Sequence, residues 1–311
     1  MFTNLGRRPL AWAVIAGACL IASAALGQPL AWAPPVLVNP VVVTIQPGDF
    51  TASCQGRDCR LVWPVGRHVG AVRIFNARNL VSIGGWNSVP QPADHSNAPP
   101  SRILEVSGAT GVVHIEGLLG DASAGGMSDG LDFNSPKAVV QIENVRIDGI
   151  FGFYDQFHAD CIQPFGGIKA LRVDHFTCRT GYQGLSLWPV SASPPGWSVD
   201  LRNVDVTSIG PIIHGGHNDG GYLYWPCQAA DCANVARTSL ANVYLQPRPG
   251  MDLATTVWTG SLVRPISGLV GFPGLPIDGH VSLGAPPGGE FVPPGVAGPG
   301  YRSPGYAAAA Q

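Results

Sequence analysis

Acidic, amide and imidazole side chains gather in one part of the chain, between residues 128 and 219. Asp129 lies in the stretch SDGLDF and Asp160 in the stretch HADCIQPF. Two carboxylates held side by side repel each other, so the pKa of one of them rises and the pair can serve as an acid and a base. Polar turn residues that cap backbone N–H groups are the alternative interpretation. The residues predicted to carry catalysis are Asp129, His158, Asp160, Gln183 and His217.

Aromatic and further polar side chains in the same stretches predict a surface that binds a substrate. Phe165, Trp188 and Trp225 are expected to stack on neighbouring strands as a strip roughly 10 Å long, and such a strip suits the apolar faces of sugar rings. A long loop, such as residues 189–197, or the C-terminal tail could instead cover the strip. The predicted substrate-binding residues are Asp132, Gln163, Phe165, Tyr182, Trp188, His214 and Trp225.

Oxygen ligands in this region allow a cation site. Asp155 and Asp219, together with Asp160, could hold Ca²⁺, which prefers carboxylate and carbonyl oxygens. A zinc site is not expected, because the cysteines show no CxxC spacing. Ca²⁺ is therefore the only cofactor that the sequence suggests.

Short strands are needed to position these residues. Ile162 and Pro164 alternate with Gln163 and Phe165, so the two pairs point to opposite faces of a strand. The residues predicted to point inward on three such strands are Leu131, Phe133, Ile162, Pro164, Leu185 and Leu187.

One phrase recurs along the chain at intervals of 27 to 39 residues, and its central apolar residues are Ile83, Ile115, Ile142, Val173, Leu201 and Leu240. The corner after each strand is Gly, Asn or His, which tolerate left-handed backbone conformations, and stacked Asn side chains could bond to one another. These corner residues are Gly85, Gly117, Asn144, His175, Asn203 and Asn242. The repeat predicts an all-β, single-stranded right-handed parallel β-helix of about seven rungs. An antiparallel β-sandwich is the alternative, but it need not repeat the corner residue in phase.

The chain divides into a leader, one folded domain and a tail. Residues 1–27 combine an Arg pair with an apolar run and small residues, which is typical of a cleaved secretory signal; a retained membrane anchor is the alternative. Residues 28–262 are predicted to form the β-helix domain, with a cap at about 36–75 and repeats at about 76–250. Residues 263–311 are rich in Pro and Gly, which do not sustain strands, and form a tail.

Charge and hydropathy narrow the function classes. The chain has 18 Lys and Arg against 20 Asp and Glu. Loss of the leader's two arginines leaves a net charge of about −4, which argues against a nucleic-acid partner. After the leader, no segment is apolar enough to span a bilayer. We therefore expect a secreted or periplasmic monomer that has no contact with a membrane once the leader is cleaved.

Six cysteines remain after the leader, and an even number in an exported chain suggests disulfides. The two cysteines of CQGRDC, and likewise those of CQAADC, are close enough in sequence to close a small loop. The two cysteines that remain, Cys161 and Cys178, lie within one repeat. The predicted pairs are Cys54–Cys59, Cys227–Cys232 and Cys161–Cys178, although the sequence leaves the connectivity open.

The stretches SDGLDF, ADCIQPF and YQGLSLW resemble the right-handed β-helix polysaccharide enzymes of the pectate lyase-like superfamily. Their order is most similar to that of the polygalacturonase-type glycoside hydrolases, which carry Asn-Thr-Asp, Asp-Asp-Cys and Gly-His-Gly on successive rungs. The resemblance matches Asp129 to the first phrase and both Asp160 and Cys161 to the second, which implies catalytic roles for the two aspartates and supports the Cys161 disulfide. The sequence departs from the family at Ala159 and Gln183, where the family has Asp and His. The resemblance covers about residues 76–250.

Three function classes are compatible with these observations. A polysaccharide hydrolase could use Asp160 with Asp129 or Asp132, and a lyase could use His158 as its base, assisted by Gln183, His217 or Ca²⁺. A non-catalytic glycan-binding protein and a structural surface protein are the alternatives. An enzyme would lose turnover when Asp160 becomes Asn, whereas a binding protein would lose affinity when Trp188 becomes Ala. A structural protein would show neither effect.

Overall fold

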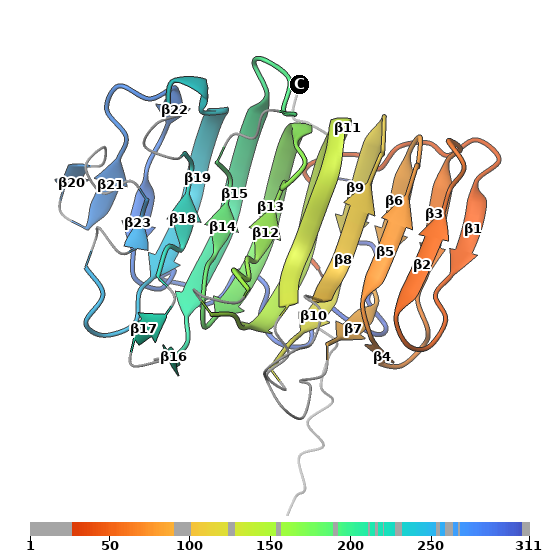
Figure 1. The fold of residues 1–311 in the computed structure, drawn as a ribbon, viewed down its shortest axis with the longest axis horizontal. Helices are drawn as coiled ribbons and strands as arrows, with labels where there is room; N and C mark the ends of the chain where they lie inside the picture. Colours follow the sequence, from red (N-terminus) through yellow and green to blue (C-terminus); the bar gives the residue numbers. More distant parts are fainter. Residues whose placement is uncertain are drawn as a thin grey trace, which may run out of the picture.

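The computed structural model describes residues 27–89, 101–123, 128–153, 157–188, 192–210, 212–214, 217–219, 221–227, 232–252, 256–258, 264–266 and 268–306. Nearly all of its strands join one large, mostly parallel sheet, and they lie side by side along the longest axis of the molecule (Figure 1). The predicted all-β class is confirmed, and the parallel pairing is compatible with a β-helix. None of the described segments is a helix of the length and hydrophobicity that a membrane span requires.

Strands from successive stretches of the chain pair in parallel as three ladders. The first ladder carries four of the predicted site residues, namely Asp129, Asp132, Gln163 and Trp225. Its strands, in order of pairing, are β2 (Phe50–Ser53), β5 (Val72–Phe75), β8 (Ser101–Ser107), β11 (Ser128–Ile150), β12 (Ile162–Gln163), β14 (Leu185–Ser186) and β18 (Tyr224–Trp225).

The second and third ladders share the long strand β11 with the first. The second consists of β1 (Val41–Thr44), β3 (Cys59–Val62), β6 (Leu80–Ile83), β9 (Val112–Glu116), β11, β13 (Ile168–Thr180), β15 (Ser198–Ser208) and β19 (Arg237–Gln246). The third joins β4 (His68–Val69), β7 (Trp86–Ser88) and β10 (Leu119–Asp121) to the C-terminal part of β11. The region predicted as a cap thus contributes β1 to β5 to the same ladders as the repeats.

Short strands also lie beyond Pro265, where the sequence predicted none. They are β20 (Arg264–Ile266), β21 (Leu269–Gly271), β22 (Ile277–Asp278) and β23 (Val281–Leu283). β22 and β23 continue the second ladder in parallel with β19, because the stretches between the prolines and glycines are just long enough to pair. β21 pairs antiparallel with β20 and with β23. β16 (Ile212–His214) and β17 (His217–Asp219) form a separate antiparallel hairpin, and Cys232–Asn234 form a 3₁₀ turn.

The apolar core is built from side chains that stack at equivalent positions of the ladders. All six residues predicted to point inward from the first ladder are buried, which confirms the alternation. A large apolar side chain that is fully buried contributes ~1.5–3 kcal/mol. One core column of the second ladder is Ile115, Ile142, Val173, Leu201 and Leu240.

Residues with a left-handed backbone conformation lie at the corners of the second ladder, as predicted. Asn144, His175, Asn203 and Asn242 have φ angles between +50° and +56°, and Asn242 Nδ2 donates to Asn203 Oδ1 at 3.0 Å. The corner preference is therefore confirmed.

The sequence prediction aligned the first repeat one residue too far toward the C-terminus. Ser82 rather than Ile83 faces Ile115, and Gly84 rather than Gly85 is the matching corner. A slip of one residue exchanges the two faces of a strand, which is why Ser82 is buried while Ile83 is 45% exposed.

The three predicted disulfides are all present. They are Cys54–Cys59, Cys161–Cys178 and Cys227–Cys232. Disulfides of this kind fit a protein exported to an oxidising compartment. The predicted leader lies almost entirely outside the described residues.

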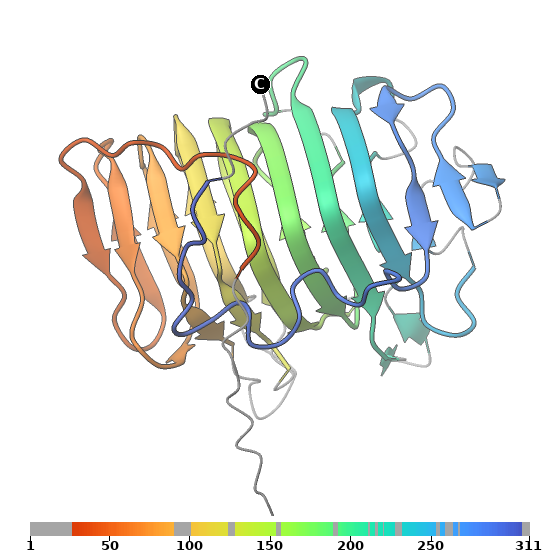
Figure 2. The same cartoon turned by 180° about the vertical axis from the view of Figure 1, so that it is seen from behind.

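The chain after β23 runs back across the outer face of the long strands (Figure 2). Arg146, which is buried on β11, donates to Glu290 Oε2 at 2.6 Å and to the carbonyl oxygen of Val292 at 2.8 Å. The hydroxyl oxygen of Thr177 accepts the Val292 N–H at 2.9 Å and donates to Asp205 at 2.7 Å. Burial raises the pKa of Asp205 to about 6. The tail is therefore anchored by specific polar contacts.

The N-terminal segment packs on the same face, close to the end of the tail. The backbone N–H groups of Ala31 and Trp32 donate to the carboxylate of Glu143. Asn144 Nδ2 donates to the carbonyl oxygen of Gln28 at 2.7 Å and to the hydroxyl of Tyr301 at 3.2 Å. One corner residue thus contacts both ends of the described chain.

The left-handed corner at Asn203 gives a stability prediction. Replacing Asn203 with Ala forces a Cβ-bearing residue without a compensating side-chain bond into φ near +50°, which costs about 1–2 kcal/mol. Replacing it with Gly removes the same bonds to Asp174 and Asn242 but relieves the strain. We expect N203A to be less stable than N203G by about 1 kcal/mol in urea unfolding. Equal stability of the two variants would contradict the corner assignment.

The tail contact at Thr177 gives a second prediction. In Thr177→Val, both hydroxyl contacts are lost from a fully buried position. We expect a loss of about 1–2 kcal/mol in the free energy of unfolding and faster proteolysis within residues 284–306. Thr207→Val is the matched control, because within the described residues the Thr207 hydroxyl makes one hydrogen bond, to the exposed Gln246 at 3.5 Å. The anchoring role would be refuted if the two variants were cleaved at the same rate.

Candidate functional site

The first ladder brings three aspartates together. Asp129 and Asp132 both lie on β11, and Leu131 between them pairs with Ile162 of β12. Asp160 comes two residues before Ile162, and its backbone N–H donates to Asp129 Oδ1 at 2.8 Å. Neighbouring strands are about 4.8 Å apart, so the three side chains form one group, which we name the carboxylate cluster.

The carboxylate cluster is buried. Asp129 is 1% exposed, and Asp132 and Asp160 are 0% exposed. Asp132 lies next to the inward-facing Leu131 and Phe133, on the opposite face of the strand, and its side chain is nevertheless fully buried. Arg102 of β8 supplies the cation, with its Nε 2.7 Å from Asp132 Oδ2 and 3.8 Å from Asp129 Oδ2.

Burial and mutual repulsion control the protonation of the cluster. Burial raises the pKa of Asp129 well above its usual range, and the charges of Asp132 and Asp160 raise it further. Burial and the charge of Asp132 likewise raise the pKa of Asp160. The pKa of Asp132 rises only to about 6, because the Arg102 guanidinium favours its ionised form. The cluster can therefore hold a protonated carboxyl beside an ionised carboxylate, which is what general acid–base catalysis requires.

Several polar atoms of the cluster lack a hydrogen bond within the described part of the chain. They are both carboxylate oxygens of Asp160, Oδ2 of Asp129, Oδ1 of Asp132 and the hydroxyl of the adjacent Ser186. These polar atoms still act on one another, because the Ser186 hydroxyl lowers the pKa of Asp160, and Asp129 and Asp132 shift each other's pKa. Perturbed carboxyl groups of this kind concentrate at functional sites.

Arg102 connects the carboxylate cluster to the surface. Its guanidinium carbon lies 5.8 Å from the ring centroid of Phe157 and 6.0 Å from that of Phe165. The Arg102 side chain is 22% exposed and Phe165 is 37% exposed. A ligand at this surface would therefore meet the guanidinium group and Phe165 before it met the carboxyl groups.

A second group of aromatic rings lies at the end of the first ladder. The ring centroids of Trp188 and Trp225 are 6.3 Å apart, those of Trp225 and Tyr222 are 5.6 Å apart, and those of Tyr222 and Trp258 are 4.8 Å apart. All four side chains are half-buried. We name them the aromatic cluster.

The predicted strip of Phe165, Trp188 and Trp225 is wrong in its register. Trp225 pairs with Ser186 and not with Trp188, because YLYW joins the ladder two residues later than expected. The ring of Phe165 instead contacts Arg102. The same shift brings Tyr222 next to Gln183, since the Gly184 N–H donates to the Tyr222 carbonyl oxygen at 2.9 Å.

The remaining predicted residues of this region surround the carboxylate cluster. Gln163 pairs with Asp132 and is half-buried. Gln183 is 7% exposed, and its backbone N–H donates to the Ala159 carbonyl oxygen at 3.2 Å. His158 is exposed, and its ring centroid lies 5.6 Å from that of the buried Tyr182.

The hairpin residues and the proposed calcium ligands are less fully described. His214, His217 and Asp219 lie on β16 and β17, where the structure describes only the backbone, and Asp155 lies outside the described residues. Within the described residues, no group of three His, Cys, Asp or Glu side chains is arranged to hold a metal ion. The Ca²⁺ alternative stays a prediction.

Sequence reasoning missed three residues of these two clusters. Arg102 begins the strand before SDGLDF, and its pairing with Asp129 follows once Leu104 is aligned with Leu131. Tyr222 was visible in YLYW and was lost through the register error. Trp258 follows Val257, which forms an isolated β-bridge with Tyr224. The repeat pattern does not predict this bridge.

The chain was compared with protein-family models, curated proteins and solved structures, and none of the three comparisons gave a match.

The raised pKa values predict an unusual dependence of stability on pH. A carboxyl whose pKa is higher in the folded state binds more protons there than in the unfolded chain, so stability falls as pH rises from about 4 through the folded pKa. Asp129, Asp132 and Asp160 all shift in this direction, as does Glu143, to about 7. We therefore expect the free energy of unfolding to decrease between pH 5 and pH 8 in urea titrations.

Asp160→Asn isolates the contribution of the carboxylate cluster. It should flatten the slope and raise stability at pH 8 by about 1 kcal/mol, since one unit of pKa corresponds to about 1.4 kcal/mol. Asp200→Asn, at an ion pair with Arg202 on β15, should leave the slope unchanged. An unaltered slope in D160N would show that the cluster does not hold the extra protons.

Proposed function

We propose that the chain is an exported right-handed parallel β-helix enzyme that cleaves a polysaccharide, with the carboxylate cluster as its catalytic group. The observation that carries the proposal is the meeting of three buried carboxyl groups with raised pKa values beside one guanidinium group. This is the electrostatic arrangement of an acid–base site.

The parallel ladders support the β-helix in this proposal. Three ladders share β11, and the left-handed corners recur in phase along the second of them, which fits a single-stranded solenoid of about seven rungs. The order of SDGLDF, ADCIQPF and YQGLSLW supports the resemblance to the pectate lyase-like superfamily. The three disulfides support export.

The chemistry follows from unequal protonation within the carboxylate cluster. A protonated carboxyl of Asp129 or Asp160 would donate its proton to the glycosidic oxygen that leaves. The ionised partner would either take a proton from a water molecule that attacks the anomeric carbon, or attack that carbon itself and be released by water in a second step. Asp132 and Arg102 form an ion pair that keeps one negative charge fixed nearby. For elimination, the exposed His158 would be the base, and Arg102 could neutralise the carboxylate of a uronate. We therefore favour an acidic polysaccharide as the substrate.

Non-catalytic glycan binding is the second candidate. It is favoured by one observation, namely that the carboxyl groups are fully buried while Phe165 and the aromatic cluster are reachable from solvent. In that case the carboxylate cluster would only position Arg102, and the departures from the family at Ala159 and Gln183 would be expected.

Turnover and binding separate the two candidates. The mature protein is assayed on a panel of neutral and acidic polysaccharides, with reducing ends and unsaturated uronates as readouts. We expect D160N to lower kcat at least 100-fold, the range of general acid–base catalysis, with little change in affinity. Trp188→Ala should weaken binding about 10-fold, or ~1.4 kcal/mol. Asp278→Asn on β22 is exposed and serves as the control for loss of a carboxylate.

The outcomes are distinct. Reducing ends that depend on Asp160 support hydrolysis, and unsaturated products that depend on His158 support elimination. Absence of turnover together with Trp188-dependent binding would reject the enzyme in favour of the glycan-binding protein. Absence of turnover and of glycan binding would reject both the enzyme and the glycan-binding protein.

A further inference from the structure

A cavity of about 570 Å³ lies away from the carboxylate cluster, where β10, β11, β13 and β15 end. Volumes of 300–1,000 Å³ are typical of sites for small organic ligands. None of Asp129, Asp132 and Asp160 lines it. The polar residues of its wall are Asp121, Ser123, Asp148 and Arg179.

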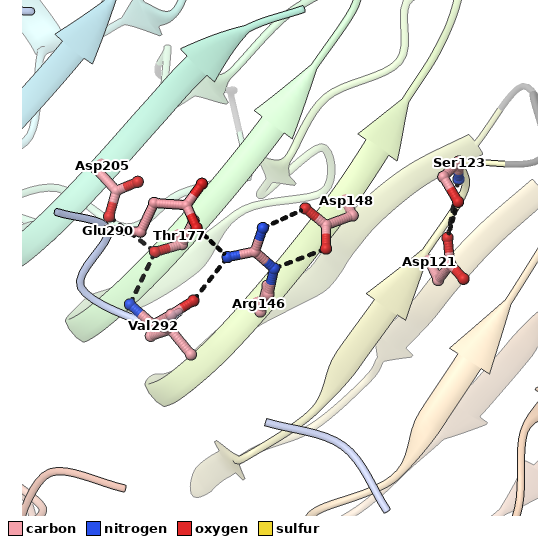
Figure 3. Close-up of polar contacts among 8 residues, drawn as sticks. All are labelled: Asp121, Ser123, Arg146, Asp148, Thr177, Asp205, Glu290 and Val292. Atoms are coloured by element: carbon pink, nitrogen blue, oxygen red, sulfur yellow. Dashed lines mark hydrogen bonds and ion pairs between the residues drawn. The ribbon is translucent and has the colours of Figure 1, made fainter. Parts of the chain in front are cut away.

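The charged residues of the cavity share one level of three neighbouring strands. Asp121 of β10 pairs with Asp148 of β11, and Asp148 pairs with Arg179 of β13. Figure 3 shows the side chains of Asp121 and Asp148 on their adjacent strands. From Asp121 to Arg179 the row spans two strand spacings, roughly 10 Å.

The two ends of the row carry charge that no ion pair within the described residues neutralises. Asp121 accepts only from the backbone N–H of Ser123, at 3.0 Å, and from the Ser123 hydroxyl. Arg179 is exposed and has neither a hydrogen bond nor an ion pair there. Asp148, in the middle, is already bound by both nitrogens of the Arg146 fork, at 2.6 and 2.9 Å. The cavity therefore offers a carboxylate acceptor at one end and a guanidinium donor at the other.

Apolar side chains complete the wall. Leu119, Ile150, Phe151 and Ile209 line the space between the charged residues, and Phe151 is half-buried. The Phe151 ring is fixed by an edge contact with Phe153, with ring centroids 4.9 Å apart. An apolar wall with a few convergent polar groups is the usual composition of a ligand site.

From this arrangement we infer that the cavity binds a short acidic oligosaccharide. A carboxylate of the sugar pairs with the Arg179 guanidinium in a charge-assisted, bidentate contact. Hydroxyl groups of the sugar donate to Asp121 and to the free lone pairs of Asp148. The choice of a sugar rests on the proposed function, because an amino acid also carries a carboxylate and hydrogen-bond donors. The volume and the span of the row favour the larger ligand.

The cavity is adjacent to the carboxylate cluster but separate from it. The carbonyl oxygen of Phe151 accepts the Ser128 N–H at 3.4 Å, and Ser128 precedes Asp129. Phe151 thus lines the cavity on one side and contacts the strand of the cluster on the other. Binding in the cavity is a subsite function, and it does not require the chemistry of Asp160.

The test uses the mature D160N protein, in which turnover is removed, and isothermal titration calorimetry with digalacturonate. We expect saturable binding that Arg179→Gln weakens at least 10-fold and that Asp121→Asn weakens about 3-fold. Arg237→Gln, at an exposed arginine on β19, should leave the affinity unchanged. Cellobiose, a neutral disaccharide, should bind at least 10-fold more weakly than digalacturonate. Unchanged unfolding midpoints show that the variants fold.

Two results would overturn the inference. They are equal affinity of R179Q and its parent, and equal affinity for the neutral and acidic disaccharides. Binding of glutamate that depends on Arg179, without binding of digalacturonate, would also overturn the sugar assignment. If digalacturonate binds through Arg179 while the polysaccharide panel shows no turnover, the cavity site stands and the proposed enzyme fails.

Discussion

In-register parallel pairing of successive strands is the constraint on which the rest of the structure depends. Each strand has a side-chain period of two, so a shared register aligns apolar columns such as Ile115, Ile142, Val173, Leu201 and Leu240 in the interior. The corners fix that register, because a left-handed residue can turn the chain only where its side chain tolerates positive φ. Asn144, His175, Asn203 and Asn242 do so at the same level of four strands.

The same pairing decides where charge accumulates. Register places Asp129 beside Arg102 and Asp132 beside Glu105, and the next repeat adds Asp160. Burial raises the pKa of each of the three carboxyl groups, and one guanidinium group favours the ionised form of only one of them, Asp132. At the other end of β11, register sets Asp148 between Asp121 and Arg179, and all three residues line the cavity. Both arrangements are consequences of a ladder that stacks polar residues as strictly as apolar ones.

The repeating parts of the molecule could be predicted from the sequence, because their signal is periodic. The inward residues, the corners and two of the disulfides follow from alternation, residue type and short loop length. The Cys161–Cys178 pair was the one left over, and the resemblance to the family supported it. The errors arose where the repeat is interrupted. Two strands were aligned in the wrong register, by one residue at Ile83 and by two residues at Trp225. Loops of unequal length before those strands account for both errors. Other features depend on contacts between segments far apart in the sequence, so no local pattern predicts them. They are the ion pair of Arg102 with the buried Asp132 and the ion pair of Glu290 with Arg146.

The central claim is that the carboxylate cluster holds protons near neutral pH. It is tested most directly by ¹³C NMR titration of the aspartate carboxyl carbons, assigned with the variants D129N, D132N and D160N. We expect at least two of the three carboxyl groups to titrate well above the ordinary aspartate value of about 4, with resonances that shift when a neighbour is replaced. Titration of all three near the ordinary value, independent of one another, would contradict the account.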